Sequence, residues 1–251
     1  MGAAELARAR QNRLTKPPGS LGRLEALSIQ VAGITGLARP VIGDKAIITC
    51  AGDHGVVAQR VSAYPQEVTA QMVRNILSGG AAIYVLARHV GARVVVLDAG
   101  IVEDVEPQSG FRIHRVGRGT ADISQGPAMS LSQAVQSIET GIQVLADERT
   151  NGLSIVATGD MGIGNTTPSS AIVAAITGRP VADVTGRGTG IDDVQWQRKV
   201  AVIERALAVN SPAASDGLAV LARVGGFEIG AIAGVILGAA ANRIPVVVDG
   251  F

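Results

Sequence analysis

Four short apolar runs, rich in β-branched residues, recur along the chain without alternating polar positions. A continuous apolar run of this length is typical of a strand that is covered on both faces, as in a parallel sheet. The sequence therefore predicts four buried parallel strands. They lie at residues 45–50, 93–97, 153–157 and 244–248.

Helical periodicity fills the intervals between these runs. Strands that alternate with helices predict a parallel α/β sheet with right-handed crossovers, flanked by helices. The longest apolar stretch, 229–241, is shorter than the roughly 18 residues that a membrane span needs, so we expect a buried helix there and no membrane partner. The expected helices are 22–37, 66–78, 81–90, 130–148, 168–177, 193–209 and 227–241.

Each predicted strand is followed by glycine and an aspartate. In open α/β sheets, ligands bind beyond the carboxyl ends of the strands, so these residues are expected to line a site at one edge. The alternative is that Asp and Gly only form turns and helix caps. The aspartates are Asp53, Asp98, Asp160 and Asp249.

The sequence GDMGIGNTTP at 159–168 joins a predicted strand to a helix. Pro168 suits the first helical position and Thr167 the N-cap, so free amides and the positive end of the helix dipole would face the glycine loop. Such a terminus binds anions, and phosphate is the expected ligand. The run matches neither the Walker nor the dinucleotide pattern, so ATP and NAD lack their motifs.

A second glycine group, GRGTGIDD at 186–193, precedes a helix that carries Arg198 and Lys199 in its first two turns. Asp192 or Asp193 is the expected cap, and one of the cations could complete a phosphate cradle. The alternative is a capped surface helix whose cations are solvated.

The segment 53–72 reads as a long irregular connection at the same sheet edge, where loops tend to determine specificity. Tyr64 lies within it and could contact a flat ring. His54 is either a general base or a structural hydrogen-bond donor. Nearer the N-terminus, Ser20 is the expected cap of the helix at 22–37.

Composition narrows the classes of partner. Lys and Arg number 22 against 21 Asp and Glu, and only three Phe, two Tyr and one Trp occur. Neither a basic surface nor a base-stacking platform is expected, which argues against nucleic acid as a partner.

Cys50 is the only cysteine, so it forms no internal disulfide or thiolate zinc cage and is expected to be a buried hydrophobe. No secretory signal is visible, so the expected location is cytoplasmic.

Read in order, the motifs resemble the nicotinate-nucleotide–dimethylbenzimidazole phosphoribosyltransferase family. The resemblance implies a Rossmann-like sheet over 41–251, an N-terminal helical segment over 1–40 that forms part of an incomplete small domain, and a homodimer. It implies transfer of the phosphoribosyl group of nicotinate mononucleotide to 5,6-dimethylbenzimidazole, which gives α-ribazole 5′-phosphate and nicotinate without a metal or other cofactor. The motifs are LTKPPGSLGRLE (14–25), AGDHGV (51–56), VSAYPQEVTAQMV (61–73), GDMGIGNTT (159–167), GRGTGID (186–192) and GGFEIGAIAG (225–234).

The resemblance also implies roles for particular residues. Asp160 stands at a catalytic position where many family members carry glutamate, and its side chain is one methylene shorter. Tyr64 and Met72 are expected against the benzimidazole. The residues expected around the nucleotide are Met161, Gly162, Gly188 and Lys199.

Family members continue beyond the position of Phe251, and the glutamate assigned as their general base lies in that further stretch. The resemblance therefore implies weakened binding and low turnover for this chain, unless Asp160 or Glu228 substitutes as the base. It also implies that the helix at 22–37 lacks packing partners. Its apolar residues Leu24, Leu27, Val31 and Ile34 are then expected to be exposed.

Two alternatives come from other functional classes. The first is a non-catalytic module that binds a nucleotide or an azole. The second is a phosphohydrolase in which Asp53, Asp98, Asp160 and Asp249 gather around Mg²⁺. Tight binding without product would favour the first, and loss of activity on chelation would favour the second.

Overall fold

A five-stranded parallel sheet forms the centre of the molecule in the computed structural model, which describes residues 2–251. The strand order is β3-β2-β1-β4-β5, so β1 lies in the middle and the chain crosses over between neighbours. This confirms the predicted parallel α/β architecture. The strands are β1 (Asp44–Gly52), β2 (Ala92–Gly100), β3 (Phe111–Ile113), β4 (Leu153–Met161) and β5 (Val246–Val247).

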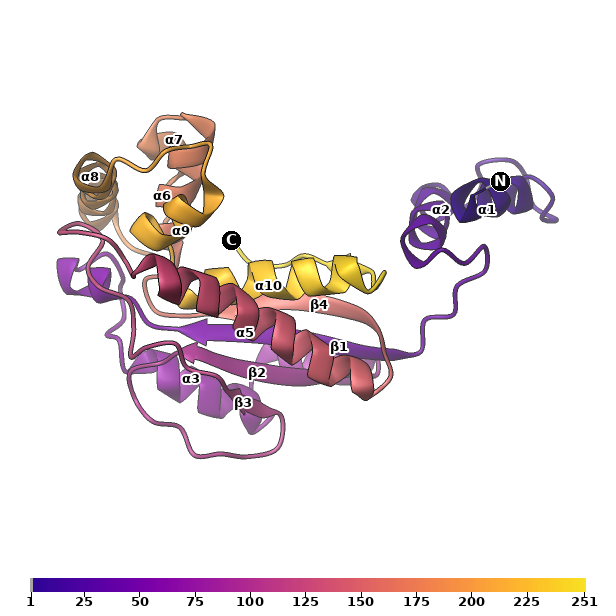
Figure 1. Cartoon of the computed structure of the whole chain (residues 1–251), viewed down its shortest axis with the longest axis horizontal. Helices are drawn as coiled ribbons and strands as arrows, with labels where there is room; N and C mark the ends of the chain where they lie inside the picture. Colours follow the sequence, from indigo (N-terminus) through magenta and orange to yellow (C-terminus); the bar gives the residue numbers. More distant parts are fainter. Residues whose placement is uncertain (1) are drawn as a thin grey trace.

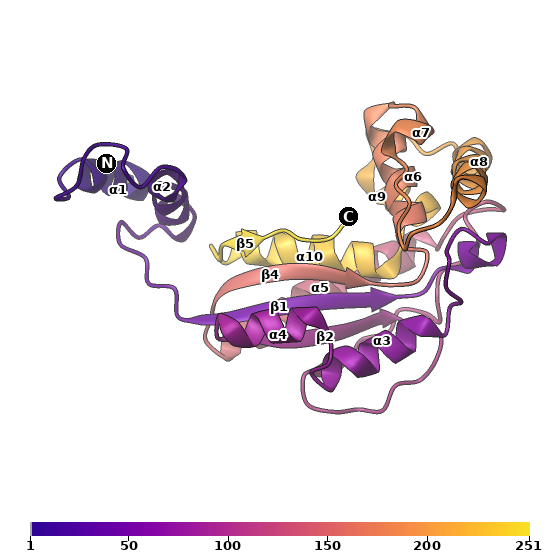
Figure 2. The ribbon, with the colours of Figure 1, turned by 180° about the vertical axis from the view of Figure 1, so that it is seen from behind.

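Helices cover both faces of the sheet. One face carries α5 (Leu131–Thr150) and α10 (Phe227–Ala241), and the other carries α3 (Val68–Leu77) and α4 (Ala82–His89) (Figures 1 and 2). Because side chains alternate along a strand, β1 supplies both cores. Ile48 and Cys50 enter the core under α5 and α10, whereas Ala51 enters the core beneath α3. Cys50 is fully buried, as the sequence predicts.

Small residues allow α5 and α10 to approach closely. A side chain at Gly141 of α5 would collide with the carbonyl of Ala231, and one at Gly234 of α10 would collide with the carbonyl of Ile138. The two glycines therefore set the separation of the helices. This contact fixes the start of α10 beside the carboxyl end of the sheet.

Four further helices gather at the carboxyl end of the strands, on the left in Figure 1. They pack on one another, and α6 contacts α7, α8 and α9. A short 3-10 helix, η1 (Gly55–Gln59), follows β1 within the segment that was expected to be irregular. The four helices are α6 (Thr166–Thr177), α7 (Val181–Val184), α8 (Asp193–Asn210) and α9 (Gly217–Val224).

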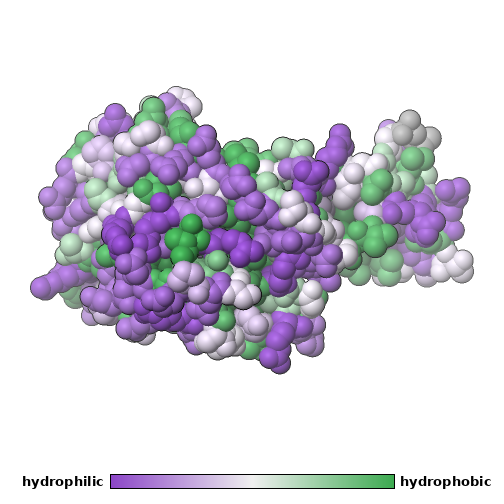
Figure 3. Space-filling view, turned by 60° about the horizontal axis from the view of Figure 1, so that its bottom comes forward, coloured by the Kyte–Doolittle hydropathy of each residue, from purple (hydrophilic) through white to green (hydrophobic). Residues whose placement is uncertain are grey.

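The N-terminal helices α1 (Ala3–Gln11) and α2 (Arg23–Thr35) pair with each other and project beyond the amino end of β1 (Figure 1). The predicted exposure of their apolar residues is only partly right. Leu24 and Leu27 are 64% and 39% exposed, but Val31 and Ile34 are partly buried. Figure 3 shows apolar side chains among polar ones on this hairpin, at the right of the view.

Several predicted boundaries are wrong for identifiable reasons. Helix α6 begins at Thr166 with Asn165 as the N-cap residue, so Thr167 is not the cap and Pro168 lies two residues further in. Gly22, not Ser20, precedes α2, because the backbone there takes a positive φ that favours glycine. By contrast, Asp192 caps α8 as predicted, accepting a hydrogen bond from the Gln195 amide at 2.7 Å.

The sheet edges differ most from the prediction. Strand β5 is only Val246–Val247, and β3 was not predicted at all because its three residues carry no distinctive apolar pattern. Within residues 2–251, every helix is too short or too polar to reach across a lipid bilayer.

Candidate active site

The strands β1 and β4 end side by side and bring three sequence motifs to one edge. Their register places Cys50 opposite Asp160 and Ala51 opposite Met161. Asp53 and His54 follow β1 directly, and the glycine loop that leads to α6 follows β4. The predicted gathering of residues at the carboxyl edge is therefore present for these two strands.

The glycine loop packs tightly against the end of β1. A Cβ atom at Gly162 would collide with the carbonyl oxygen of Gly52, and Gly164 takes a φ of +84°. The Ile163 amide donates to Thr69 Oγ1 of α3 at 3.0 Å. These contacts hold the loop between the sheet and α3, so that it delivers the chain into the first turn of α6.

Lys199 reaches this first turn from α8. Its side chain is 1% exposed, and the ammonium donates to Thr166 Oγ1 at 2.6 Å and to the Gly186 carbonyl at 3.4 Å. Both partners are neutral oxygens, and burial lowers the pKa of Lys199 to about 8. A poorly solvated cation beside a helix N-terminus is an arrangement that favours an anion.

A small cavity joins Lys199 to the two glycine loops. The hydroxyls of Ser62 and Thr189 lie 3.5 Å apart across it, and the Ala63 amide donates to Thr189 Oγ1 at 3.4 Å. The structure thus brings Gly188 and Lys199 together with the loop after Gly162. The lining residues are Val61, Ser62, Gly164, Asn165, Thr166, Gly188, Thr189 and Lys199.

Asp160 lies at the end of β4, next to this cavity. Its carboxylate accepts a hydrogen bond from the Asn165 side-chain amide. Burial, followed by the negative charges of Glu228 and Asp249, raises the pKa of Asp160, whereas His54 acts in the opposite direction. A carboxylate with a raised pKa at the edge of a ligand cavity is a candidate proton acceptor.

The residues expected around an aromatic acceptor lie in three different segments: Met72 in α3, Met161 at the end of β4 and Tyr64 before α3. Met72 lies one turn after Thr69, the residue that holds the loop, and it is partly buried. Met161 packs beside the core beneath α3. Tyr64 precedes α3 and is 52% exposed, which leaves its ring accessible.

The sequence leaves the role of His54 open and offers Glu228 only as a substitute base. In the structure the two side chains lie together, with 3.0 Å between His54 Nε2 and Glu228 Oε1, and both are buried. The signal that could have identified the pair is the single acidic residue within the apolar run 227–241. A carboxylate in such a helix requires a buried partner.

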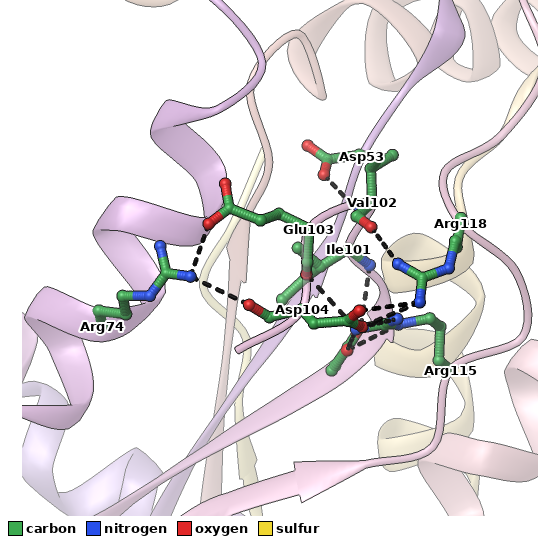
Figure 4. Close-up of polar contacts among 9 residues, drawn as sticks. Asp53, Arg74, Ile101, Val102, Glu103, Asp104, Arg115 and Arg118 are labelled. Carbon is green, nitrogen blue, oxygen red and sulfur yellow. Dashed lines mark hydrogen bonds and ion pairs between the residues drawn. The ribbon is translucent and has the colours of Figure 1, made fainter. Parts of the chain in front are cut away.

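Asp53 and Asp98 stabilise the loop after β2 (Figure 4), whereas the backbone of Asp249 bonds with Thr158 of β4. Asp98 accepts hydrogen bonds from Arg115 at 2.7 and 2.9 Å and from the Ile101 amide at 2.8 Å. Asp53 Oδ2 accepts from the Val102 amide at 2.9 Å. Across residues 2–251, no three His, Cys, Asp or Glu side chains are placed to hold a metal ion. The arrangement therefore does not support the phosphohydrolase alternative, which required these aspartates to converge.

The comparison with protein families agrees with this site. Residues 1–251 match the family described as phosphoribosyltransferase. A parallel sheet with an anion-binding helix terminus at its carboxyl edge suits an enzyme that holds a sugar phosphate. The fold and the site thus define a phosphoribosyltransferase.

Two named relatives identify the particular family within this class of enzymes. A protein from Roseiflexus sp. (strain RS-1) named nicotinate-nucleotide–dimethylbenzimidazole phosphoribosyltransferase is 63% identical over 249 residues, which are 99% of this chain and 70% of the relative. A protein of the same name from Chloroflexus aggregans (strain MD-66 / DSM 9485) is 61% identical with the same coverage. The chain belongs to the nicotinate-nucleotide–dimethylbenzimidazole phosphoribosyltransferase family.

A solved structure supports the same assignment. The crystal structure of CobT from Thermus thermophilus superposes with a TM-score of 0.94 at 43% identity, and the match covers 99% of this chain and 74% of that one. The predicted family and fold class are therefore confirmed.

Proposed function

We propose that this protein transfers the phosphoribosyl group of nicotinate mononucleotide to 5,6-dimethylbenzimidazole, giving α-ribazole 5′-phosphate and nicotinate, a step in the assembly of cobalamin. The observation that carries the proposal is the buried Lys199 ammonium at the start of α6, in a chain that is 63% identical to a relative named for this activity. The relatives are named as transferases, so a module that only binds lacks their support.

The 5′-phosphate is assigned to the cavity between the two glycine loops. The first turn of α6 supplies amides and the positive end of a helix dipole, while Lys199 supplies a full charge. Gly188 takes a φ of +53°, and a Cβ atom there would lie 3.0 Å from Thr166 Oγ1 and 3.5 Å from Lys199 Nζ, so a side chain at this position would approach the groups that are proposed to hold the phosphate. Fixing the phosphate orients the ribose, and orientation is a major source of rate enhancement.

The azole is assigned to the apolar side of the same edge. Met72 and Met161 offer polarizable side chains to a flat ring, and Tyr64 can stack on it from the exposed side. In this proposal the acceptor lies next to the ribose at the end of β4.

The chemical step is a displacement at the anomeric carbon. The unprotonated azole nitrogen attacks from the α face, the β-glycosidic bond to nicotinate breaks, and nicotinate leaves with the electron pair. The other azole nitrogen then carries a proton that must be removed. Asp160 is the proposed acceptor, because a raised pKa makes its carboxylate a stronger base.

Product formation tests the proposal directly. The protein is incubated with nicotinate mononucleotide and 5,6-dimethylbenzimidazole, and α-ribazole 5′-phosphate and nicotinate are measured in equal amounts by mass spectrometry. Asp160→Asn is expected to slow product formation about 10²–10⁴-fold, the usual contribution of a general base. Tight binding of both substrates without product would favour the binding module.

Residues 1–40, which include the N-terminal hairpin, are proposed as one part of a small helical domain, separate from the sheet domain of 41–251, and as a dimer contact. The apolar groove between α1 and α2 supports this, because Leu24 and Leu27 line it and are exposed. Exposed apolar surface of this kind marks interfaces. Sedimentation analysis should show a homodimer, and Leu24→Glu should weaken it.

A cytoplasmic location is also part of the proposal and is tested by cell fractionation.

A further inference from the structure

Two ionisable side chains lie beneath the glycine loop at positions where burial makes charge costly. His54 is 1% exposed and Glu228 is fully buried, with 3.0 Å between Nε2 and Oε1. Glu228 lies in the first turn of α10, where the helix dipole favours a negative charge. Because a buried ion pair adds little net stability over apolar residues, a role in the neighbouring site is the better explanation for it.

Three glycines show how closely this pair is connected to the site. A Cβ atom at Gly52 would lie 2.6 Å from Glu228 Oε2, and one at Gly226 would lie 2.6 Å from His54 Cε1 and from both carboxylate oxygens. A Cβ atom at Gly162 would lie 3.4 Å from His54 Nε2. The pair therefore contacts the end of β1, the start of α10 and the loop that follows Asp160.

The charges around the pair are mostly negative. Burial alone would lower the pKa of His54, but the Glu228 carboxylate, with smaller contributions from Asp53 and Asp160, outweighs it and raises the pKa. Burial and Glu228 raise the pKa of Asp160, and His54 acts in the opposite direction by lowering it. The titratable groups that face the pair or Asp160 are Cys50, Asp53, Asp160 and Asp249.

We propose that His54 is a positioning residue that, as an imidazolium paired with Glu228, supplies the positive charge that keeps Asp160 ionised. The catalytic consequence rests on the proposed function, in which ionised Asp160 accepts the azole proton. The charge state itself does not depend on that function, so it can be measured in the absence of substrates.

Nuclear magnetic resonance of the intact chain tests the proposal. The ring nitrogens of His54 should both be protonated at pH 7, with the other two histidines assigned through His89→Gln and His114→Gln. Carboxyl ¹³C titration, assigned through Asp160→Asn, should show that His54→Gln raises the midpoint of Asp160, because the loss of a nearby positive charge disfavours the carboxylate. Glu228→Gln should lower the pKa of His54 without raising that of Asp160.

These outcomes separate a charge effect from loosened packing. Water that enters a loosened site would lower the midpoint of Asp160 in both variants, whereas loss of the imidazolium raises it in one of them. If His54→Gln does not fold, the protonation state of the His54 ring in the unmodified protein and in Glu228→Gln decides the proposal, because both proteins keep the histidine: the ring should be charged at pH 7 in the first and lose its proton more readily in the second.

A neutral His54 at pH 7 would overturn the proposal, as would a midpoint of Asp160 that is unchanged or lower when the imidazole is removed. In the active protein, the acid limb of kcat should move upward by the same amount as the midpoint, with KM for the mononucleotide unchanged. Absence of turnover in the unmodified protein would contradict the proposed function, and the titrations would still decide the role of His54.

Discussion

Replacing Lys199 with methionine should stabilise the protein while it weakens the binding of mononucleotide. Lys199 is 1% exposed and its hydrogen-bond partners are the neutral oxygens of Thr166 and Gly186. Methionine has similar length and flexibility and carries no charge, so it suits the space that Lys199 occupies. The substitution therefore removes the charge with little change in packing.

The size of the effect follows from the pKa. A decrease from 10.5 in the unfolded chain to about 8 in the folded one corresponds to about 3 kcal/mol that opposes folding while the lysine is charged. Loss of the hydrogen bond to Thr166 offsets about 1 kcal/mol of that gain. We expect Lys199→Met to raise the free energy of unfolding by about 1–2 kcal/mol at pH 7.

The sign of the pH dependence provides a second check. Below pH 8, both folded and unfolded chains carry the proton and the full penalty is present. Between about 8 and 10.5 the unfolded chain still binds the proton but the folded chain does not, so the stability of the unmodified protein rises with pH. The advantage of Lys199→Met should therefore decrease across this window and reverse above it, where the variant should be about 1 kcal/mol less stable because it lacks the hydrogen bond to Thr166.

Binding should respond in the opposite direction. Hydrogen bonds to charged groups contribute about 1.5–3 kcal/mol, so Lys199→Met should weaken nicotinate mononucleotide binding about 10- to 150-fold at pH 7, measured by calorimetry. Affinity of the unmodified protein should also decrease above pH 8 as Lys199 loses its proton. Lys45→Met, at the far end of β1, is the matched control and should leave affinity unchanged. A Lys199→Met variant that is less stable and binds normally would refute the reasoning.

Three further predictions concern residues outside the phosphate cavity. Glu148 is buried between Arg93 and Arg112, which both reach solvent, so Glu148→Gln should lower the free energy of unfolding in urea by about 1.5–3 kcal/mol, the contribution of charged hydrogen bonds. Burial raises the pKa of the Cys50 thiol, so a thiol reagent should label it only after unfolding; rapid labelling of the native protein would contradict this. Tyr64 is half exposed, so Tyr64→Ala should raise KM for the azole without lowering stability, and an unchanged KM would remove Tyr64 from the site.

The central part of the fold could be predicted because both faces of the sheet are covered. Strands β1, β2 and β4 have continuous apolar runs, and α10 has the bounds that its composition predicts. The edge strands could not be predicted in the same way. Strand β3 pairs with only three residues of β2, so hydrogen bonding, and not an apolar run, defines it.

The candidate site also has one part that could be predicted from the sequence and one part that could not. Gly162, Gly188 and Lys199 come together because their motifs lie at strand and helix ends, where glycine and caps leave a visible signal. The start of α6 at Thr166 was missed because Asn165 bonds with Asp160 instead of capping the helix through its side chain. Local rules of capping do not include a competing carboxylate from the preceding strand.

The sequence did not predict that two charged side chains of the site are buried, and these are the groups that act on its chemistry. Apolar periodicity treats Lys199 and Glu228 as exceptions in otherwise buried helix faces, yet both side chains lie at the edge where the strands end. Each charge opposes folding, and each acts more strongly on a neighbouring charge because water is excluded. Lys199 faces a cavity with neutral partners, so its charge is available to an anion, whereas Glu228 is paired with His54 and acts through it. The two buried charges therefore differ in function because one has a partner within the protein and the other is left for the substrate.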